Sequence, residues 1–151
     1  MVITKAQISD FLQIAELDRI AWLDNDNSEF IPDGEHAWRL WVEHALVVCA
    51  KEGQQIFGVA IAFPSINNTY CLHKVFVAKQ ARGKGLGRKL MSTLNHDFDQ
   101  LSTSAFLTVD PNNTNAIALY RKLGFTSEKY VEDYYRPQEH RIVLTRPAKR
   151  V

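Results

Sequence analysis

The chain has 151 residues, of which 46% are hydrophobic and 23% are charged. This length predicts about one domain, residues 1–151, and the composition provides a core that needs no disulfide or metal ion to hold it. No apolar run approaches the ~18 residues of a membrane span, and the N-terminus lacks the pattern of a signal peptide. We therefore expect a cytoplasmic protein that has no membrane partner.

Charge is divided unevenly along the chain, although the net charge is only +1. Residues 1–68 hold ten acidic and four basic side chains, and residues 69–151 hold fourteen basic and seven acidic ones. A basic half can face a phosphorylated cofactor or a nucleic acid, and an acidic half suits a cation, but both can equally be solvated surface. The two cysteines, Cys49 and Cys71, lie in apolar runs that are typical of buried free thiols.

The first 64 residues predict a strand, two helices and two further strands. In the first helix Ile8, Phe11, Leu12 and Ala15 recur at helical spacing, and a polar, acidic loop follows it. The second helix runs directly into a strand. The predicted ranges are strand 2–6, helix 8–22, helix 37–45, strand 45–52 and strand 55–64.

The rest of the chain predicts four strands and two helices, and the last of the strands closes the fold. An apolar stripe marks the first of these helices, and the second has Asn112 or Asn113 as its N-cap and Gly124 as its C-terminal stop. The element order β-α-α-β-β-β-α-β-α-β-β predicts a single α/β or α+β domain with a mixed sheet. The ranges are strand 70–79, a helix from Gly85 with its stripe at Leu86, Leu90, Leu94, Phe98 and Leu101, strand 104–110, helix 111–125, and strands 125–135 and 140–147.

The stretch RGKGLGRKLM, residues 82–91, sets three glycines at every second position among four cations. It joins a strand that ends at Val77 to a helix that begins near Gly85. Free N–H groups and the dipole at a helix start attract an anion, and glycines allow close approach of a phosphate and positive φ. A plain strand-to-helix turn is the alternative, but it needs neither three glycines nor four cations. The stretch therefore predicts a pyrophosphate site, although the spacing fits neither GxGxxG nor GxxxxGK(S/T).

Two linked motifs, and the strand before the first of them, carry a resemblance to a known family. The first is Arg82-x-x-Gly85-x-Gly87, with a second register at Gln80-x-x-Gly83-x-Gly85, and it follows the strand end Val75-Phe76-Val77. The second is Asn113-x-x-Ala116-x-x-Leu119-Tyr120-x-x-x-Gly124-Phe125. They resemble the acyl-CoA motif R/Q-x-x-G-x-G/A and the second signature of the GNAT superfamily of N-acetyltransferases. The resemblance covers essentially the whole chain and implies that family's fold, a central mixed, mostly antiparallel sheet flanked by helices.

The resemblance also implies roles for individual residues. Tyr120 is then the general acid that donates to the departing CoA thiolate, because a phenol hydrogen-bonded to the sulfur can give up its proton as charge develops. The backbone of the strand end holds the pantetheine and the acetyl carbonyl, the loop wraps the pyrophosphate, and Asn113 contacts the pantetheine arm. Lys84 and Lys89 can equally be solvated cations. The implied residues for acetyl-CoA are Val75, Phe76, Val77, Arg82, Gly83, Lys84, Gly85, Leu86, Gly87, Arg88, Asn113 and Tyr120, and no metal is implied.

The base that deprotonates the acceptor amine is left open by the sequence. An alkyl amine near pKa 10 is mostly ammonium at pH 7, so a base or a water chain helps its attack. Thr108 stands where the branch that acetylates protein N-termini commonly has a glutamate, and threonine is no base. His73 is a candidate because it would share the face of Val75 and Val77 by strand alternation, and the alternative is a histidine that only packs. Other candidates are Glu132, Asp133 and waters held by Tyr134 or Tyr135.

The loop between the first two helices usually lines the acceptor cleft in this family. Here it carries four carboxylates and two aromatic residues, which suit a cationic amine, although a solvated loop has the same composition. These residues are Trp22, Asp24, Asp26, Glu29, Phe30 and Asp33.

The resulting hypothesis is an acetyl-CoA-dependent enzyme that acetylates a primary amine of a small molecule by direct attack in a ternary complex. The alternatives are a protein N-terminal acetyltransferase of the ribosomal-protein-alanine type and a non-catalytic acyl-CoA-binding module. A nucleic-acid partner is not expected, because no motif for one is present. We expect a monomer or a homodimer, and a cysteine-based ping-pong route is disfavoured because both cysteines lie outside the motifs.

Overall fold

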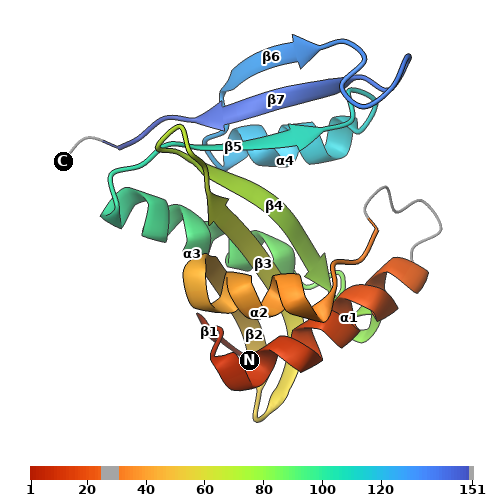
Figure 1. The fold of residues 1–151 in the computed structure, drawn as a ribbon, viewed down its shortest axis with the longest axis vertical. Coiled ribbons are helices and arrows are strands. Elements are labelled where there is room, and N and C mark those ends of the chain that lie inside the picture. Colours follow the sequence, from red (N-terminus) through yellow and green to blue (C-terminus); the bar gives the residue numbers. More distant parts are fainter. Residues whose placement is uncertain (25–30, 150–151) are drawn as a thin grey trace. The chain divides into compact units, whose positions relative to one another are not determined.

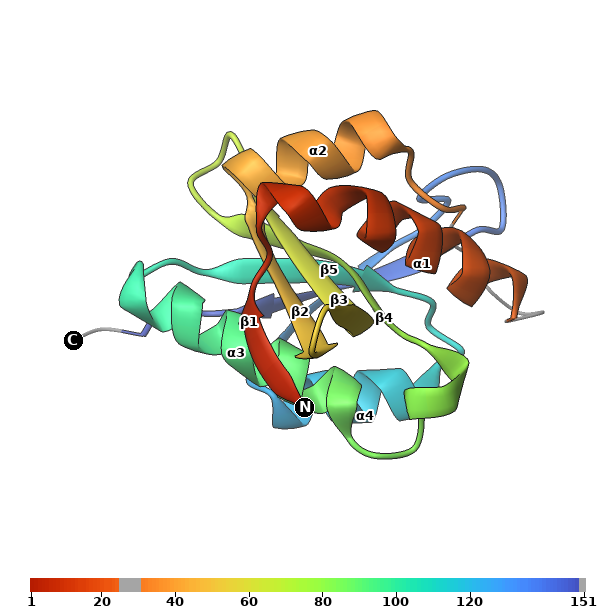
Figure 2. The same cartoon turned by 90° about the horizontal axis from the view of Figure 1, so that it is seen from below.

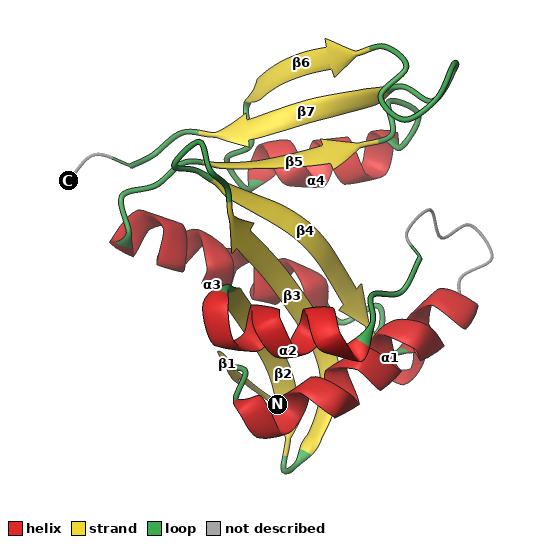
Figure 3. Cartoon of the chain, in the orientation of Figure 1, coloured by secondary structure: helices red, strands yellow, loops and turns green. Residues whose placement is uncertain are grey.

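A computed structural model describes residues 1–24 and 31–149 (Figures 1 and 3). The order of strands and helices in the described residues is the one that the sequence predicts. Short 3-10 helices precede α1 and α3, at Ile8–Asp10 and Lys79–Ala81. The elements are β1 (Val2–Lys5), α1 (Phe11–Leu23), α2 (Glu35–His44), β2 (Leu46–Glu52), β3 (Gln55–Pro64), β4 (Tyr70–Val77), α3 (Leu86–Gln100), β5 (Ala105–Val109), α4 (Thr114–Lys122), β6 (Ser127–Val131) and β7 (Arg141–Arg146).

The strands follow the order β1-β2-β3-β4-β5-β7-β6 in one sheet of the described chain. The pairs β1–β2, β2–β3, β5–β7 and β6–β7 are antiparallel, and β4 and β5 are parallel where Tyr70 and Cys71 face Ala105 and Phe106. The predicted mixed, mostly antiparallel sheet is thereby confirmed. Contacts group the chain into two compact units, residues 1–63 with 73–94 (unit 1) and residues 64–72 with 95–151 (unit 2). The single domain 1–151 stays a prediction.

In unit 1, helices lie on both faces of the strands (Figure 2). Val59 and Ile61 of β3 join a buried cluster with Ile14 of α1 and Trp38 of α2. Gly58 points to the opposite face, because a Cβ there would lie 3.0 Å from Cδ1 of Leu90 in α3. Alternation along one strand thus sends successive residues to the α1–α2 layer and to α3. Glycine at 58 lets α3 approach the sheet closely, and this anchors the helix that follows the glycine loop.

In unit 2, strands β5, β7 and β6 pair side by side and α4 is held at both of its ends. Asn113 is the N-cap, since its Oδ1 accepts from the Ala116 N–H at 3.3 Å, and Gly124 ends the helix with φ +99°. The sequence left the cap open between Asn112 and Asn113, and it is Asn113. The carbonyl of Leu123 then accepts from Nδ2 of Asn95 at 2.9 Å, so α4 is also fixed to the second half of α3.

Three local expectations differ from the structure. Of the apolar residues predicted on the first helix, Ala15 is buried and Phe11 packs against the core, but Ile8 and Leu12 are exposed, and α1 also buries Ile14, Leu17 and Ala21. Both sets have helical spacing, so only packing decides which face meets the sheet.

The other two concern the ends of elements. Leu101 is exposed because α3 ends at Gln100, one residue before the last position of the predicted stripe. Strand β6 ends at Val131 rather than at residue 135, and Asp133 adopts φ +53°, which is incompatible with extended backbone.

Candidate functional site

The glycine loop connects β4 to α3 within unit 1. Gly83 and Gly85 have φ of +80° and +73°, a conformation that L side chains rarely adopt. The first hydrogen bond of α3 runs from the Lys89 N–H to the Gly85 carbonyl at 3.1 Å, so the preceding amides have no acceptor inside the helix. A loop with positive-φ glycines and free amides at a helix start has the chemistry of an anion site.

Gly87 serves the loop differently from the other two glycines. It lacks a positive φ, and a Cβ on it would lie 3.7 Å from Cγ1 of Val75 and 3.9 Å from Cγ2 of Val77, which are ordinary contacts. The backbone of this structure therefore does not itself require glycine at 87. The same distances show that Val75 and Val77 face the start of α3.

Positive charge surrounds the loop. Arg82, Lys84, Arg88 and Lys89 are exposed, whereas Leu86 is buried beneath the loop. Within residues 1–24 and 31–149, none of these four cations forms an ion pair with a carboxylate. Arg82 folds back, and its Nε donates to the Val77 carbonyl at 3.0 Å. The uncompensated charge and the free amides together fit a pyrophosphate such as that of a coenzyme.

The two residues expected on α4 lie in unit 2. Asn113 uses Oδ1 as the helix cap, and Tyr120 lies two turns further along the helix. Tyr120 is half-buried, with its ring centroid 6.4 Å from that of Phe125, and burial raises the pKa of its hydroxyl. A raised pKa keeps the phenol protonated at neutral pH, which is the state that a general acid needs.

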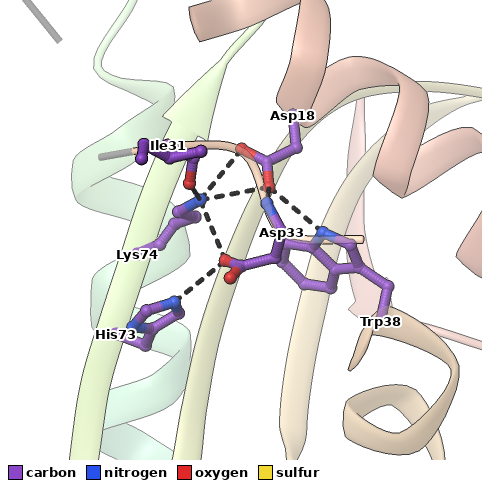
Figure 4. A network of polar contacts seen from close by, with 6 residues as sticks. All are labelled: Asp18, Ile31, Asp33, Trp38, His73 and Lys74. Carbon is purple, nitrogen blue, oxygen red and sulfur yellow. Dashed lines mark hydrogen bonds and ion pairs between the residues drawn. The ribbon is translucent and has the colours of Figure 1, made fainter. Parts of the chain in front are cut away.

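A buried network of charged groups joins α1, the segment before α2 and β4 (Figure 4). Oδ1 and Oδ2 of Asp18 each accept from Nζ of Lys74 at 3.1 Å, and Oδ2 also accepts from Nε1 of Trp38 at 3.1 Å. Lys74 Nζ further lies 2.9 Å from Oδ2 of Asp33 and donates to the Ile31 carbonyl at 3.1 Å. The backbone N–H of Asp33 donates to Asp18 at 2.9 Å. The network therefore fixes residues 31–33, next to α2, against β4.

Sequence reasoning missed Asp18 and Lys74. Only 4% of Asp18 and 8% of Lys74 is exposed, so both charges are buried and paired. The available signal was Asp18 itself, which interrupts the apolar face of α1 four residues after Ile14. A carboxylate on a buried helix face demands a partner, but the sequence does not say which cation supplies it.

His73 does not share the face of Val75 and Val77, and that expectation is wrong. Its Nε2 lies 3.0 Å from Oδ2 of Asp33, and its ring centroid lies 5.0 Å from that of Trp41 and 5.7 Å from that of Phe63. The neighbouring Lys74 reaches the same carboxylate, so strand alternation is interrupted where β4 meets the Asp33 segment (Figure 4).

The other residues expected to recognise the acceptor are dispersed. Trp22 and Asp24 are exposed at the end of α1, whereas Asp26, Glu29 and Phe30 lie outside the described residues. A cavity of about 500 Å³ borders α1, the β2–β3 hairpin and residues 78–80. It is lined by two carboxylates, Glu16 and Asp24, and by the cation Lys79, but by none of the residues of the Asp33–His73 contact.

The remaining candidates for the base, Glu132, Asp133, Tyr134 and Tyr135, are exposed after β6 in unit 2. Thr108, which is no base, pairs with Val143 in the β5–β7 ladder. His140 Nδ1 accepts from the Asp133 N–H at 3.0 Å, and the rings of Tyr134 and Tyr135 form an edge-to-face pair. Their contacts are those of an exposed turn and show no buried network like that of Asp33.

The cysteines and the metal chemistry add no further candidate site. Burial raises the pKa of both Cys49 and Cys71 to about 11, so both thiols are protonated at neutral pH and are poor nucleophiles. Across the described ranges, no group of three or more His, Cys, Asp or Glu residues could hold a metal ion. No helix of these ranges is long and apolar enough to span a membrane.

Comparison with known proteins gives consistent results. Residues 11–125 match the model of the acetyltransferase (GNAT) family. The chain is 27% identical over 157 aligned positions to an L-2,4-diaminobutyric acid acetyltransferase from Marinococcus halophilus, covering 96% of this chain and 87% of the relative.

Two solved structures share the fold. The ribosomal-protein-S18-alanine N-acetyltransferase from Escherichia coli superposes with a TM-score of 0.79 at 21% identity, covering 99% of this chain and 95% of that one. A putative acetyltransferase from Salmonella typhimurium, solved with its cofactor acetyl-CoA, gives 0.77 at 22% identity, with coverage of 100% and 95%. Identities this low support the shared fold and nothing finer.

Proposed function

The chain belongs to the acetyltransferase (GNAT) family, and on that premise we propose that it acetylates a primary amine of a small, cationic molecule. The amine attacks acetyl-CoA directly in a ternary complex. The observation that carries the use of acetyl-CoA is the glycine loop, where unpaired cations and free amides meet at the start of α3. Residues Arg82 to Arg88 bind the pyrophosphate, and the Val75–Val77 strand end positions the thioester.

The chemistry of the carbonyl and the sulfur needs few protein groups. A backbone N–H of the strand end can polarise the acetyl carbonyl, which stabilises the oxyanion that forms on attack. Tyr120 donates a proton to the departing sulfur, and burial, which raises the pKa of its hydroxyl, leaves that hydroxyl protonated at neutral pH. Both cysteine thiols remain protonated, which supports direct transfer over an acetyl-cysteine intermediate.

A small cationic acceptor is supported by two observations. The first is the relative named for L-2,4-diaminobutyric acid, a diamine, which aligns over most of the chain. The second is the partly exposed Asp33 carboxylate, whose partner His73 contacts the rings of Trp41 and Phe63, because carboxylates and aromatic faces both attract ammonium groups. An acidic N-terminal half is consistent with such a substrate.

Acetylation of protein N-termini is the second candidate, and a shared fold with the ribosomal-protein enzyme is its support. Against it, position 108 on β5 holds threonine, which cannot take a proton from an N-terminal ammonium. A peptide that begins with alanine therefore belongs in the test as a competing acceptor. A non-catalytic acyl-CoA-binding module would bind acetyl-CoA and release no thiol with any acceptor.

The test is a panel of acceptors assayed by thiol release from acetyl-CoA, with the acetylated product identified by mass spectrometry. L-2,4-Diaminobutyrate, spermine and an alanine-starting peptide are the probes. We expect turnover with at least one small diamine or polyamine and none with the peptide. Turnover with the peptide alone would replace the proposal by the second candidate.

Replacing Tyr120 by Phe separates an enzyme from a binding module. We expect kcat to fall by about 10²-fold, the usual size of an acid–base contribution, while acetyl-CoA binding is kept. Tyr70→Phe is the matched control, because Tyr70 packs on Phe98 and lies outside the motifs. Equal rates in wild type and Tyr120→Phe would remove Tyr120 from the mechanism.

A further inference from the structure

The contact between Asp33 and His73 has the geometry of a carboxylate–imidazole pair. Nε2 of His73 lies 3.0 Å from Oδ2 of Asp33, and the side chains are 28% and 26% exposed, respectively. Both groups are therefore sheltered but remain accessible to a small molecule. Figure 4 shows the imidazole on β4 with Nε2 turned toward Asp33.

The ionisation of Asp33 sets the tautomer of the imidazole. Burial opposes the charge of this carboxylate, but hydrogen bonds from Lys74 and His73 outweigh burial and hold its pKa below the usual range. An ionised carboxylate only accepts hydrogen bonds, so Nε2 of His73 carries the proton. In the neutral imidazole Nδ1 is then the basic nitrogen, and it has no hydrogen-bond partner among the described residues.

The surroundings hold this pair in place. Lys74 binds Oδ2 of Asp33 at 2.9 Å and is itself anchored by Asp18. The groups that pack against the imidazole from α2 and β3 are the uncharged rings of Trp41 and Phe63. Within this network Asp33 contacts the imidazole directly, and Lys74 and Asp18 each contact Asp33. As in a hydrolase triad, an aspartate holds one ring nitrogen and leaves the other exposed to act as a base, but here the aspartate holds Nε2 and the remaining nitrogen is Nδ1.

His73 lies on β4 close to the strand end that is proposed to hold the acetyl group. His73 lies two residues before Val75, which is roughly 7 Å along an extended strand. The strand end Val75–Val77 is the part of β4 that leads into the glycine loop and, in the proposed function, holds the thioester. An acceptor that approaches the thioester from the α2 side would meet Asp33, His73 and the ring of Trp41.

We propose that His73, oriented by Asp33, is the general base of the acetyl transfer. Nδ1 takes one proton from the ammonium of the acceptor and leaves a neutral amine. The amine nitrogen then forms a bond to the acetyl carbon, and the C–S bond breaks with its electron pair passing to sulfur. The sulfur receives the proton of Tyr120, which leaves a phenolate. The phenolate takes the second proton from the nitrogen, so that Tyr120 is protonated again, and His73 releases its proton to solvent. His73 is a catalytic residue in this scheme, and Asp33 is a positioning residue.

This inference rests on the proposed function, and a pH profile of kcat/KM for the acceptor tests it. With a histidine base, the reactive species are neutral imidazole and ammonium, so wild-type kcat/KM levels off across neutral pH. In His73→Gln only the neutral amine reacts, so kcat/KM rises about tenfold per pH unit toward the amine pKa near 10. We expect a loss of about 10²-fold at pH 7 that shrinks steadily toward pH 10. A purely structural role would lower the rate equally at every pH.

The variants are chosen so that folding and chemistry are separated. Gln can still donate to Asp33, and His73→Asn is a second variant without a base. Asp33→Asn should lower kcat/KM at pH 7 by about tenfold or more, because the imidazole loses its orienting anion. His44→Gln is the matched control, since His44 also contacts a carboxylate, Glu43, but is exposed on α2. Thermal unfolding and the stabilisation by acetyl-CoA confirm that each variant is folded and binds the co-substrate.

The outcomes distinguish this inference from the function on which it rests. Turnover by wild type together with parallel pH profiles for wild type and His73→Gln would overturn the base assignment and leave the amine acetyltransferase standing. No turnover by wild type with any probe would overturn both. A pH-dependent loss in His73→Gln, with an unchanged His44→Gln profile, is the result that we expect.

Discussion

At the scale of single residues, the buried ion pairs of β4 explain why so many charges lie inside unit 1. Lys74 carries one positive charge and contacts the carboxylates of Asp18 and Asp33. Burial makes each of these charges costly alone, and the network is stable only because every member has partners. The same contacts fix the Asp33 segment, so a stabilising cluster also shapes the proposed base.

Replacing Lys74 by Met should destabilise the protein by about 3–5 kcal/mol, the usual cost of removing one partner from a buried pair. The stem keeps a similar volume, but two carboxylates are left facing each other. Chemical denaturation at pH 7 measures the change. Arg39→Met is the control, because Arg39 pairs with Glu43 on the surface of α2 and the loss of such an exposed pair should change stability far less. Similar losses in the two variants would contradict this interpretation of the network.

At the scale of elements, the junction of β4 and α3 combines two requirements. The loop needs positive φ at Gly83 and Gly85, and the helix start needs its first amides free. Gly58 on β3 brings the first turns of α3 against the sheet, where Leu86 and Leu90 are buried. The proposed anion site is therefore held by the packing of its helix and does not depend on the loop alone.

Replacing Gly85 by Ala should weaken acetyl-CoA binding by about tenfold or more. The left-handed conformation costs an L residue about 1–2 kcal/mol, so the loop is expected to move away from it. Gly53→Ala is the matched control, because Gly53 has a similar φ of +62° in the β2–β3 hairpin. Both variants should lose stability, and only Gly85→Ala should lose affinity, as measured by calorimetric titration. Unchanged affinity in Gly85→Ala would argue against the loop as the pyrophosphate site.

At the scale of the whole molecule, some of the excess acidic side chains in residues 1–68 form ion pairs with lysines inside the protein. Asp10 binds Lys51 at 2.8 Å, and Asp18 binds Lys74, so two of these acids are buried structural groups. The basic half, in contrast, keeps exposed cations at the glycine loop, at Lys84, Arg88 and Lys89. In the acidic half of the sequence, part of the charge therefore stabilises the fold. In the basic half, the exposed cations can bind an anion.

Acetyl-CoA should raise the thermal unfolding temperature of the protein by a few degrees. A ligand at 100 times its Kd adds about 2.7 kcal/mol of stability. NAD and ATP are the controls, and neither should produce a comparable shift. The shift should also shrink at 1 M salt, because exposed cations are screened there over roughly 3 Å. No shift with acetyl-CoA would mean that the loop binds another anion or none.

Features with local causes were predictable from the sequence. The element order, the glycine loop, an asparagine cap at position 112 or 113 and the Gly124 stop all follow from residues that act within a few positions of themselves, and the structure selects Asn113 as the cap. The family motifs belong to the same class, because they lie on one strand end, one loop and one helix. Chemistry written into a short segment can be recognised without knowing what packs against it.

Only the tertiary structure decided which face of α1 is buried, which partners Lys74 has and where His73 points. The sequence offered two helical faces on α1, and contact with the sheet selected the one that carries Asp18. His73 and Asp33 are 40 positions apart, and Lys74 and Asp18 are 56 positions apart. Such contacts depend on how distant segments pack and on an interruption of strand alternation, neither of which leaves a pattern in the local sequence. The chain thus encodes the proposed acetyl-CoA loop locally, whereas the proposed base exists only through long-range packing.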